Sequence, residues 1–254
     1  MELLGAVIAG AFIGAVLGFV GAGGAMVSVP ILIYFFDFDA KSATTAALAI
    51  VFLTALSGLI PKARNLQILY REAFVVVGIG LFTNLGFALS ASRFPDAFVT
   101  TGFAVVLIIA ALSMLVTPQF RPETRMPLPV LILISLLIGS LTGIFGIGGG
   151  FLAIPVLVLF FGTPPAKAAG TSLLIISLNS LISLLGHHAM WDSVAWQIPI
   201  YIGVSAIVFA QIASHFSTNA SPKILRTAFA ILLILIAILT LLDTWIIENF
   251  QISL

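Results

Sequence analysis

Ten apolar runs follow one another along this chain, and only short polar stretches separate them. Hydrophobic residues make up 61% of the sequence and charged residues 7%, whereas a soluble domain has about 25% charged residues. A fold of this composition cannot cover its surface with side chains that water solvates, but a lipid bilayer accepts it. We therefore predict an all-α polytopic membrane protein with segments at 3–20, 25–36, 44–60, 72–91, 97–117, 130–145, 150–161, 170–186, 194–214 and 224–242.

The residues that catalysis and metal binding require are scarce. The chain has no cysteine, which excludes disulfides and thiolate chemistry, and no Asp or Glu falls near the middle of a predicted segment. The sequence contains no nucleophile–base pair, no metal-ligand spacing and no phosphate-binding loop. It therefore predicts a protein that is not an enzyme and that has no cofactor, metal or nucleic-acid partner. The first apolar run has no basic region before it, so we expect a membrane segment rather than a cleaved signal peptide.

A glycine cluster followed by a proline occurs twice, as GAGGAMVSVP at 21–30 and GIGGGFLAIP at 146–155. Alignment of 14–36 with 139–161 gives nine identities in 23 positions, several of them glycine or proline. Shared hydrophobicity does not explain such specific matches, so the chain is predicted to be a duplicated half. The predicted parts are a first repeat of five segments (1–117), a linker (118–129) and a second repeat of five segments (130–254).

The positive charges predict how the two repeats lie in the membrane. If the glycine-tipped pairs are hairpins, or if all ten segments alternate sides, the same loops fall on the same sides. The side with the linker then holds eight of the ten Lys and Arg residues, and the other side holds Lys41, Arg93 and most acidic residues. The positive-inside rule places the linker in the cytoplasm and both termini outside. The halves are then antiparallel, an inverted-topology repeat typical of secondary transporters.

The segments that follow the glycine clusters are too short to cross a bilayer. Each of 25–36 and 150–161 has 12 residues, about 18 Å of helix against a hydrocarbon core of roughly 30 Å. We predict that each forms a broken hairpin with the segment before it, with the glycine tip inside the membrane. The amides at such a tip and at a helix N-terminus favour an anion without a basic side chain.

Other glycines and polar residues have structural alternatives to substrate binding. Gly10, Gly14, Gly18, Gly139 and Gly143 have the spacing of close helix–helix contacts. The hydroxyls near the starts of 44–60 and 170–186 either cap these helices or donate to substrate oxygens, and Asn179 binds either a neighbouring helix or the substrate. His187 and His188 are expected at the outer interface without a role in proton transfer. The candidate substrate-binding residues are Gly21, Gly23, Gly24, Thr45, Gly146, Gly148, Gly149, Gly150, Thr171, Ser172 and Asn179.

The doubled GxGG…P motif, the A-K-x-A-x-T element at 40–45 and 166–171, and the five-plus-five layout resemble the sulfite exporter TauE/SafE family, also called the 4-toluene sulfonate uptake permease family. The likeness covers essentially the whole chain. It implies a transporter of sulfur-containing anions such as sulfite, thiosulfate or organosulfonates. The first tip, GAGGA at 21–25, has fewer glycines than the second, so the two tips are expected to contribute unequally.

Two functions from different classes fit these observations. The first is a secondary transporter that exports a small sulfur oxyanion or sulfonate across a bacterial inner membrane and binds it near the midplane through the glycine-rich helix N-termini. The second is an anion channel, or a membrane-complex subunit that carries no anion, in which the glycines only pack.

Overall fold

The computed structural model describes residues 2–20, 24–90, 93–115, 127–145, 153–154, 156–160, 162–216, 222–242 and 244, and it is helical wherever it has regular secondary structure in these ranges. The predicted all-helical fold is confirmed there. The first five segments form α1 (Glu2–Val20), α2 (Gly24–Phe36), α3 (Ala40–Arg64), α4 (Tyr70–Ser90) and α5 (Asp96–Leu115). The later ones form α6 (Leu128–Phe145), η2 (Val156–Phe160), α8 (Pro165–Gly186), η3 (His188–Ser193), α9 (Gln197–Phe216) and α10 (Pro222–Leu242).

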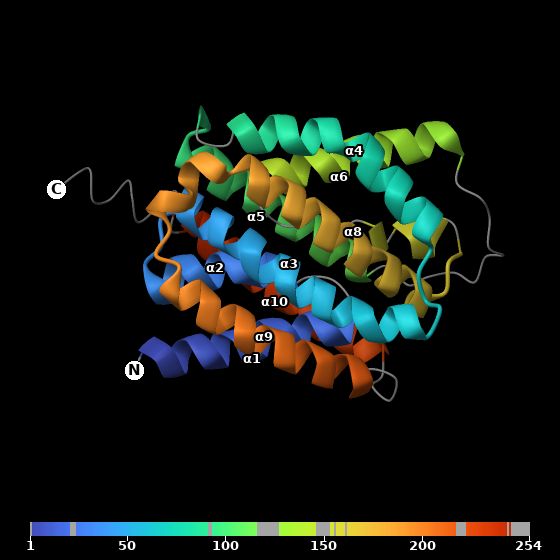
Figure 1. Cartoon of the computed structure of the whole chain (residues 1–254), viewed down its shortest axis with the longest axis horizontal. Helices are drawn as coiled ribbons and strands as arrows, with labels where there is room; N and C mark the ends of the chain where they lie inside the picture. The colour runs from blue at the N-terminus through green and yellow to red at the C-terminus, as the bar shows by residue number, and fades with distance from the viewer. Residues whose placement is uncertain are drawn as a thin grey trace.

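Six of the described helices are long and apolar enough to cross a membrane, namely α1, α3, α4, α6, α8 and α9. In α3 and α8, 67% of the most apolar window is buried within the protein, compared with 33–39% in the other four. Figure 1 shows α3 and α8 side by side in the middle of the molecule, with α1 along α9 and α4 along α6 on either side. The two central helices therefore form the protein-lined interior, and the outer pairs present apolar side chains to lipid.

The glycines predicted to pack helices do so. A Cβ atom added to Gly10, Gly14 or Gly18 of α1 would meet backbone atoms of α9, and one added to Gly139 or Gly143 of α6 would meet backbone atoms of α4. These helices approach one another so closely that no side chain fits between their backbones. The prediction of helix contact is confirmed for all five residues.

The two short segments differ in their helix type but end in the same way. α2 is a 13-residue α-helix with Pro30 inside it, whereas η2 is a five-residue π-helix. After each segment, one residue has a positive φ angle, which is 55° at Asp37 and 64° at Gly162. Aspartate and glycine adopt this left-handed conformation more readily than most residues do. The next amides donate to the carbonyl oxygens of Leu32 and Leu157, over 3.1 and 3.0 Å.

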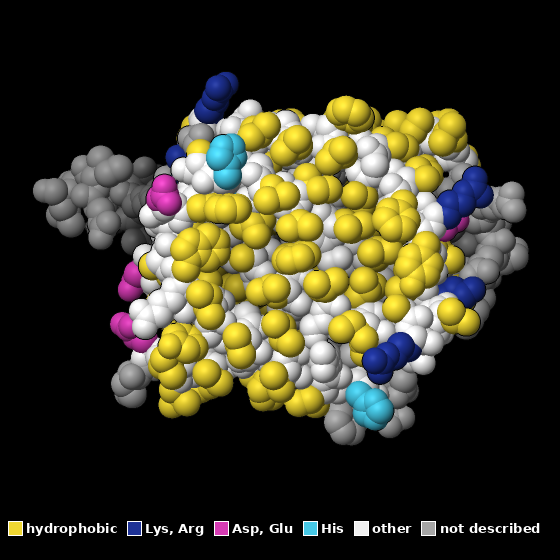
Figure 2. Space-filling view, viewed as in Figure 1, with side chains coloured by type: hydrophobic (Ala, Val, Ile, Leu, Met, Phe, Trp, Pro, Cys, Tyr) yellow, Lys and Arg dark blue, Asp and Glu magenta, His cyan; other side chains and the backbone are white. Residues whose placement is uncertain are grey.

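Charged side chains gather at the ends of the helices. Loop 37–39 and the turn of η3 lie at one end of the molecule, and loops 65–69 and 162–164 lie at the other (Figure 1). Figure 2 shows hydrophobic side chains over the middle of this face, most Lys and Arg at one end, and most Asp and Glu at the opposite end. This distribution matches a bundle that crosses a bilayer lengthwise.

The interpretation of the threonines as helix caps is wrong. α3 begins at Ala40, and its N-cap is Asp39, whose carboxylate accepts a hydrogen bond from the Ser42 amide over 3.0 Å. α8 begins at Pro165 without a side-chain cap. Both helices begin several residues before the predicted segments, because Ala, Lys and Pro are compatible with a first helical turn although they are not part of an apolar run. Thr45 and Thr171 therefore lie inside the helices.

Candidate functional site

Six of the predicted substrate-binding residues lie outside the described part of the chain, namely Gly21, Gly23, Gly146, Gly148, Gly149 and Gly150. The seventh glycine, Gly24, begins α2, so its amide lies at a helix N-terminus, as the sequence predicts. Its Cα is packed against α1, where an added Cβ would lie 2.8 Å from the Leu17 side chain. The Gly24 carbonyl oxygen accepts a hydrogen bond from the Ser28 hydroxyl over 2.7 Å. The position thus combines close packing with an amide at a helix start.

Thr45 is fully buried and connects the start of α3 to the end of α8. Its Oγ1 lies 3.0 Å from Nδ1 of His187 and 2.9 Å from the carbonyl oxygen of Lys41. The other ring nitrogen of His187, Nε2, lies 3.3 Å from the carbonyl oxygen of Gly143. Because a carbonyl only accepts, the neutral ring carries its proton on Nε2, and Nδ1 is an acceptor. The Thr45 hydroxyl has one proton, which either Nδ1 or the Lys41 oxygen receives. His187 therefore joins α3, α6 and α8.

Thr171 has the corresponding place at the opposite end of α8. Its hydroxyl donates to the carbonyl oxygen of Lys167 over 2.7 Å and accepts from the amide of Leu69, in the loop after α3, over 2.9 Å. Ser172, the next residue, is also fully buried. The hydroxyl proton of Thr171 is engaged in the helix, so a substrate oxygen would have to displace that bond to receive it. The structure thus brings Thr45 and Thr171 to opposite ends of the α3–α8 contact, not to one point.

The last turn of α6 is held by side chains from α8. The carbonyl groups of a final helical turn have no partner within their own helix. Here the Ser183 hydroxyl donates to the Thr142 oxygen over 3.3 Å, and His187 donates to the Gly143 oxygen. α6 ends at Phe145, directly before the second glycine cluster. These bonds fix the point from which the chain enters that cluster.

Asn179 faces Asn84 of α4, and both residues are fully buried. The Asn84 side-chain nitrogen donates to the Asn179 backbone oxygen over 3.0 Å and to its Oδ1 over 3.4 Å. Among the described residues, Oδ1 of Asn84, Nδ2 of Asn179 and the hydroxyl of the adjacent Ser180 have no hydrogen-bond partner. Each such buried group costs about 1–3 kcal/mol, so this cluster is suited to a polar guest.

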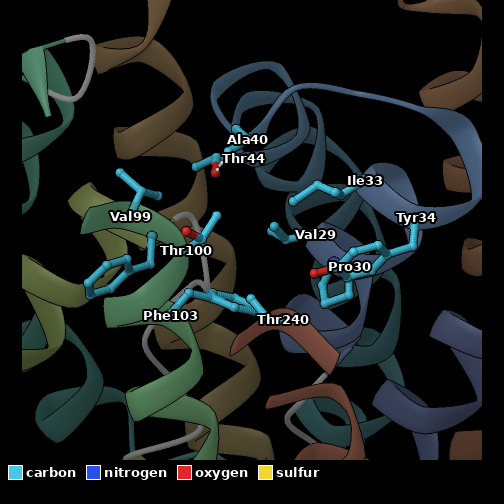
Figure 3. A pocket seen from close by; sticks show the side chains of 11 residues that line it. Val29, Pro30, Ile33, Tyr34, Ala40, Thr44, Val99, Thr100, Phe103 and Thr240 are labelled. Carbon is cyan, nitrogen blue, oxygen red and sulfur yellow. Dashed lines mark hydrogen bonds between the residues drawn. The ribbon is translucent and has the colours of Figure 1, made fainter. Parts of the chain in front are cut away.

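A small pocket lies at each end of the described part of the bundle, each with room for about one water molecule. The first is enclosed by α2 and α5, with Thr44 of α3 and Thr240 of α10 between them (Figure 3). The second lies between α4, α6, η2 and α8 and extends from Glu72 and Thr171 to Ile175. Ile175 is one helical turn from Asn179. Neither pocket has room for a molecule larger than water in this conformation.

Comparison with known proteins identifies the family. The model of the sulfite exporter TauE/SafE family matches residues 6–240. The chain belongs to this family. A probable membrane transporter protein of Xylella fastidiosa (strain 9a5c) is 28% identical over 250 residues, which cover 93% of this chain and 94% of the relative. No solved structure gives a significant match.

Two further relatives of this TauE/SafE protein have the same description. The probable membrane transporter protein YunE of Bacillus subtilis (strain 168) is 26% identical over 217 residues, 73% of this chain and 79% of YunE. The probable membrane transporter protein MJ0441 of Methanocaldococcus jannaschii is 38% identical over 122 residues, 46% of this chain and 45% of that protein. The relatives are named as membrane transporters, and none of these names describes an enzyme.

His187 is a residue that the sequence did not place in this site. The sequence places it at the outer interface without a role in proton transfer, and the structure shows a side chain that is only 2% exposed. Its neighbour His188 is exposed. Only the folding of α3 and α6 against α8 distinguishes the two rings, and no spacing in the sequence marks the contact of Thr45 with His187.

The buried ring should make stability depend on pH. Burial lowers the pKa of His187 below its ordinary value of 6.5, and the hydrogen bond to Gly143 opposes this only in part. The unfolded chain then takes up the proton at a higher pH than the folded protein. Stability from neutral His187 is therefore present above about pH 6.5 and is lost as the pH falls from there towards the folded pKa.

The expected result is a melting temperature that falls with acidification in the purified wild type and falls less in His187→Gln. Thermal unfolding of detergent-solubilised protein, recorded by circular dichroism over this pH range, measures both slopes. His188→Gln is the matched control and should keep the wild-type slope. Equal slopes in all three proteins would exclude His187 as the titrating group.

Proposed function

We propose that this protein is a secondary transporter that exports a small sulfur-containing anion, such as sulfite, thiosulfate or an organosulfonate, across a bacterial inner membrane. The family match over residues 6–240 carries this proposal. A fully buried polar cluster between α4, α6 and α8 supports it, because unpartnered polar atoms are rarely kept in an apolar bundle without a function. The negative potential inside a cell favours outward movement of an anion by about 2.3 kcal/mol per charge per 100 mV.

The binding site in this proposal lies where the glycine tips meet the interior of the bundle. The amides of Gly21, Gly23, Gly24, Gly146, Gly148, Gly149 and Gly150 would hold the anion, and Thr45, Thr171, Ser172 and Asn179 would contribute polar side-chain atoms. Two observations support this location. α2 begins at Gly24, and the first amides of a helix have no partner within that helix. Ser183 of α8 and His187, which follows it, hold the last turn of α6 at the entry to the second cluster.

We further propose that the two halves are inverted-topology repeats with both termini outside and the linker in the cytoplasm. The helix partners support this: α1 packs on α9, and α6 packs on α4, so the first helix of each half packs on the fourth predicted segment of the other. α2 and η2 also end with the same left-handed residue position and the same backbone bond. Rocking of one half against the other would open the two pockets alternately.

Counterflow of labelled sulfite in proteoliposomes tests the proposed function. A carrier should show saturable uptake that unlabelled sulfite inside the vesicles accelerates. Flux without this acceleration would indicate a channel, and an absence of flux for sulfite, thiosulfate and sulfoacetate would indicate a subunit that transports none of them. Empty liposomes, and liposomes with an unrelated membrane protein, provide the controls.

Single-cysteine labelling tests the orientation, because the chain has no native cysteine. Asn65 and Ser193 are both exposed, at opposite ends of the helices. A cysteine at Ser193 should react with a membrane-impermeant maleimide in intact cells, whereas one at Asn65 should react only after permeabilisation. Reaction of both from outside would contradict the inverted arrangement.

A further inference from the structure

The two asparagines that face each other between α4 and α8 have side-chain orientations that the contact itself decides. The Asn84 atom 3.0 Å from the Asn179 backbone oxygen must be the amide nitrogen, because two carbonyl oxygens would repel one another. The Asn179 atom 3.4 Å from that nitrogen must then be its oxygen. A rotation of either amide would bring like groups together, so the two unpartnered atoms are assigned by chemistry rather than by convention.

These unpartnered atoms are of opposite kinds. Oδ1 of Asn84 only accepts hydrogen bonds, and Nδ2 of Asn179 only donates them. Both side chains are fully buried, and the two amides are in contact. A small guest that enters between α4 and α8 when these helices part would therefore meet both atoms. A fully deprotonated oxyanion would satisfy Nδ2 but would place a negatively charged oxygen against the lone pairs of Asn84. A guest that carries one acidic proton on its oxygens satisfies both.

We infer that Asn84 and Asn179 select the singly protonated form of an oxyanion, hydrogensulfite rather than sulfite dianion, as the species that this protein carries. The inference rests on the proposed function and adds the protonation state of the transported anion. Asn84 Oδ1 accepts from the acidic O–H, and Asn179 Nδ2 donates to an oxygen of the same anion. A monoanion also loses less hydration than a dianion on entering a site without a basic side chain among the described residues.

The approach to the pair supports this assignment. The pocket between α4, α6, η2 and α8 extends from the end of the bundle that the proposal places in the cytoplasm. Its residue Ile175 lies on α8 one turn before Asn179. Beyond the pair, the Gly143 turn of α6 lies against Asn84, since a Cβ on Gly143 would meet the Asn84 backbone oxygen. The asparagines therefore lie between the pocket and the chain that enters the second glycine cluster.

The test is sulfite binding by the purified protein across the pH range in which hydrogensulfite becomes the dianion. If only the protonated form binds, the dissociation constant, expressed as total sulfite concentration, should rise about tenfold for each pH unit above the pKa of hydrogensulfite. The reason is that hydrogensulfite then becomes a steadily smaller fraction of the total. Methanesulfonate keeps one charge and no acidic proton over this range, so it should bind more weakly than hydrogensulfite, and any pH dependence of that weaker binding reports titration of the protein itself. Sulfate, a dianion throughout, should bind at least about tenfold more weakly than sulfite at acidic pH.

Two variants separate the two atoms. Asn179→Leu removes the donor but keeps the backbone oxygen that Asn84 binds, so it should weaken sulfite binding at every pH. Asn84→Ser replaces a fixed acceptor with a hydroxyl that can turn to donate, so it should flatten the pH dependence and improve sulfate binding. The wild-type titration decides the matter even if either variant fails to fold.

The outcomes distinguish a failure of this inference from a failure of the proposed transporter function. A dissociation constant for total sulfite that stays constant with pH, or equal binding of sulfate, would overturn the selection of the protonated form and leave the transporter proposal standing. Absence of binding and counterflow for every sulfur anion at every pH would reject the transporter proposal, and the inference with it.

Discussion

Gly14→Ala should separate α1 from α9 and lower the stability of the protein by about 1–3 kcal/mol, the range for overpacked interiors. The new Cβ would lie 2.9 Å from the Ala206 Cα, and closer still to the Ala206 carbonyl oxygen. Backbone atoms of a helix cannot move aside as a flexible side chain can, so the helices themselves must part. The added methyl group also breaks a contact surface that Gly10 and Gly18 share.

The measurement is thermal unfolding of the detergent-solubilised variant against wild type. Gly78→Ala in α4 makes the same chemical change at an exposed position with no atom within 4 Å of the new Cβ. It should be neutral or stabilising by up to about 1 kcal/mol, because alanine favours a helix more than glycine does. A loss of stability in Gly78→Ala equal to that in Gly14→Ala would show that the α1–α9 contact is not the cause.

Gly148→Val should abolish anion binding while the protein still folds, if the glycine amides hold the anion. A branched side chain next to those amides would occupy the space that the anion needs, and valine strongly disfavours any left-handed backbone conformation. A bound anion stabilises the native state by about 2.7 kcal/mol at a hundredfold excess over its dissociation constant. Wild type should therefore show a rise in melting temperature with sulfite that the variant lacks.

Gly14→Ala is also the control for this second experiment, because it should change stability and leave anion binding unaltered. It should lower the melting temperature but keep the sulfite-dependent increase, because its contact with α9 lies in a packing interface. A Gly148→Val protein that binds sulfite as wild type does would show that the amides do not form the binding site, and that the second glycine cluster serves packing alone.

The sequence predicted most of the helices because a bilayer leaves the backbone no alternative to helix for long apolar runs. α1 and α2 begin within one residue of the predicted segments, and α10 ends where predicted. The sequence could not predict the starts of α3 and α8, since Ala40 and Pro165 begin helices without belonging to an apolar run. Nor could it distinguish η2 from α2, because both copies have the same length and the same proline.

The spacing of the glycines was enough to predict which faces of α1 and α6 contact another helix. The 3.6-residue repeat fixes the face on which each glycine lies, and a row of glycines on one face allows a second backbone to come very near. The partners of polar side chains were decided only by the tertiary structure. Thr45, Asn84 and His187 lie far apart in the sequence, and a hydroxyl, an amide or an imidazole can bond to whatever element packs beside it. Which helix that is depends on how α3, α4 and α6 assemble around α8, and the cluster of unpartnered atoms at Asn84 and Asn179 exists only in that assembly.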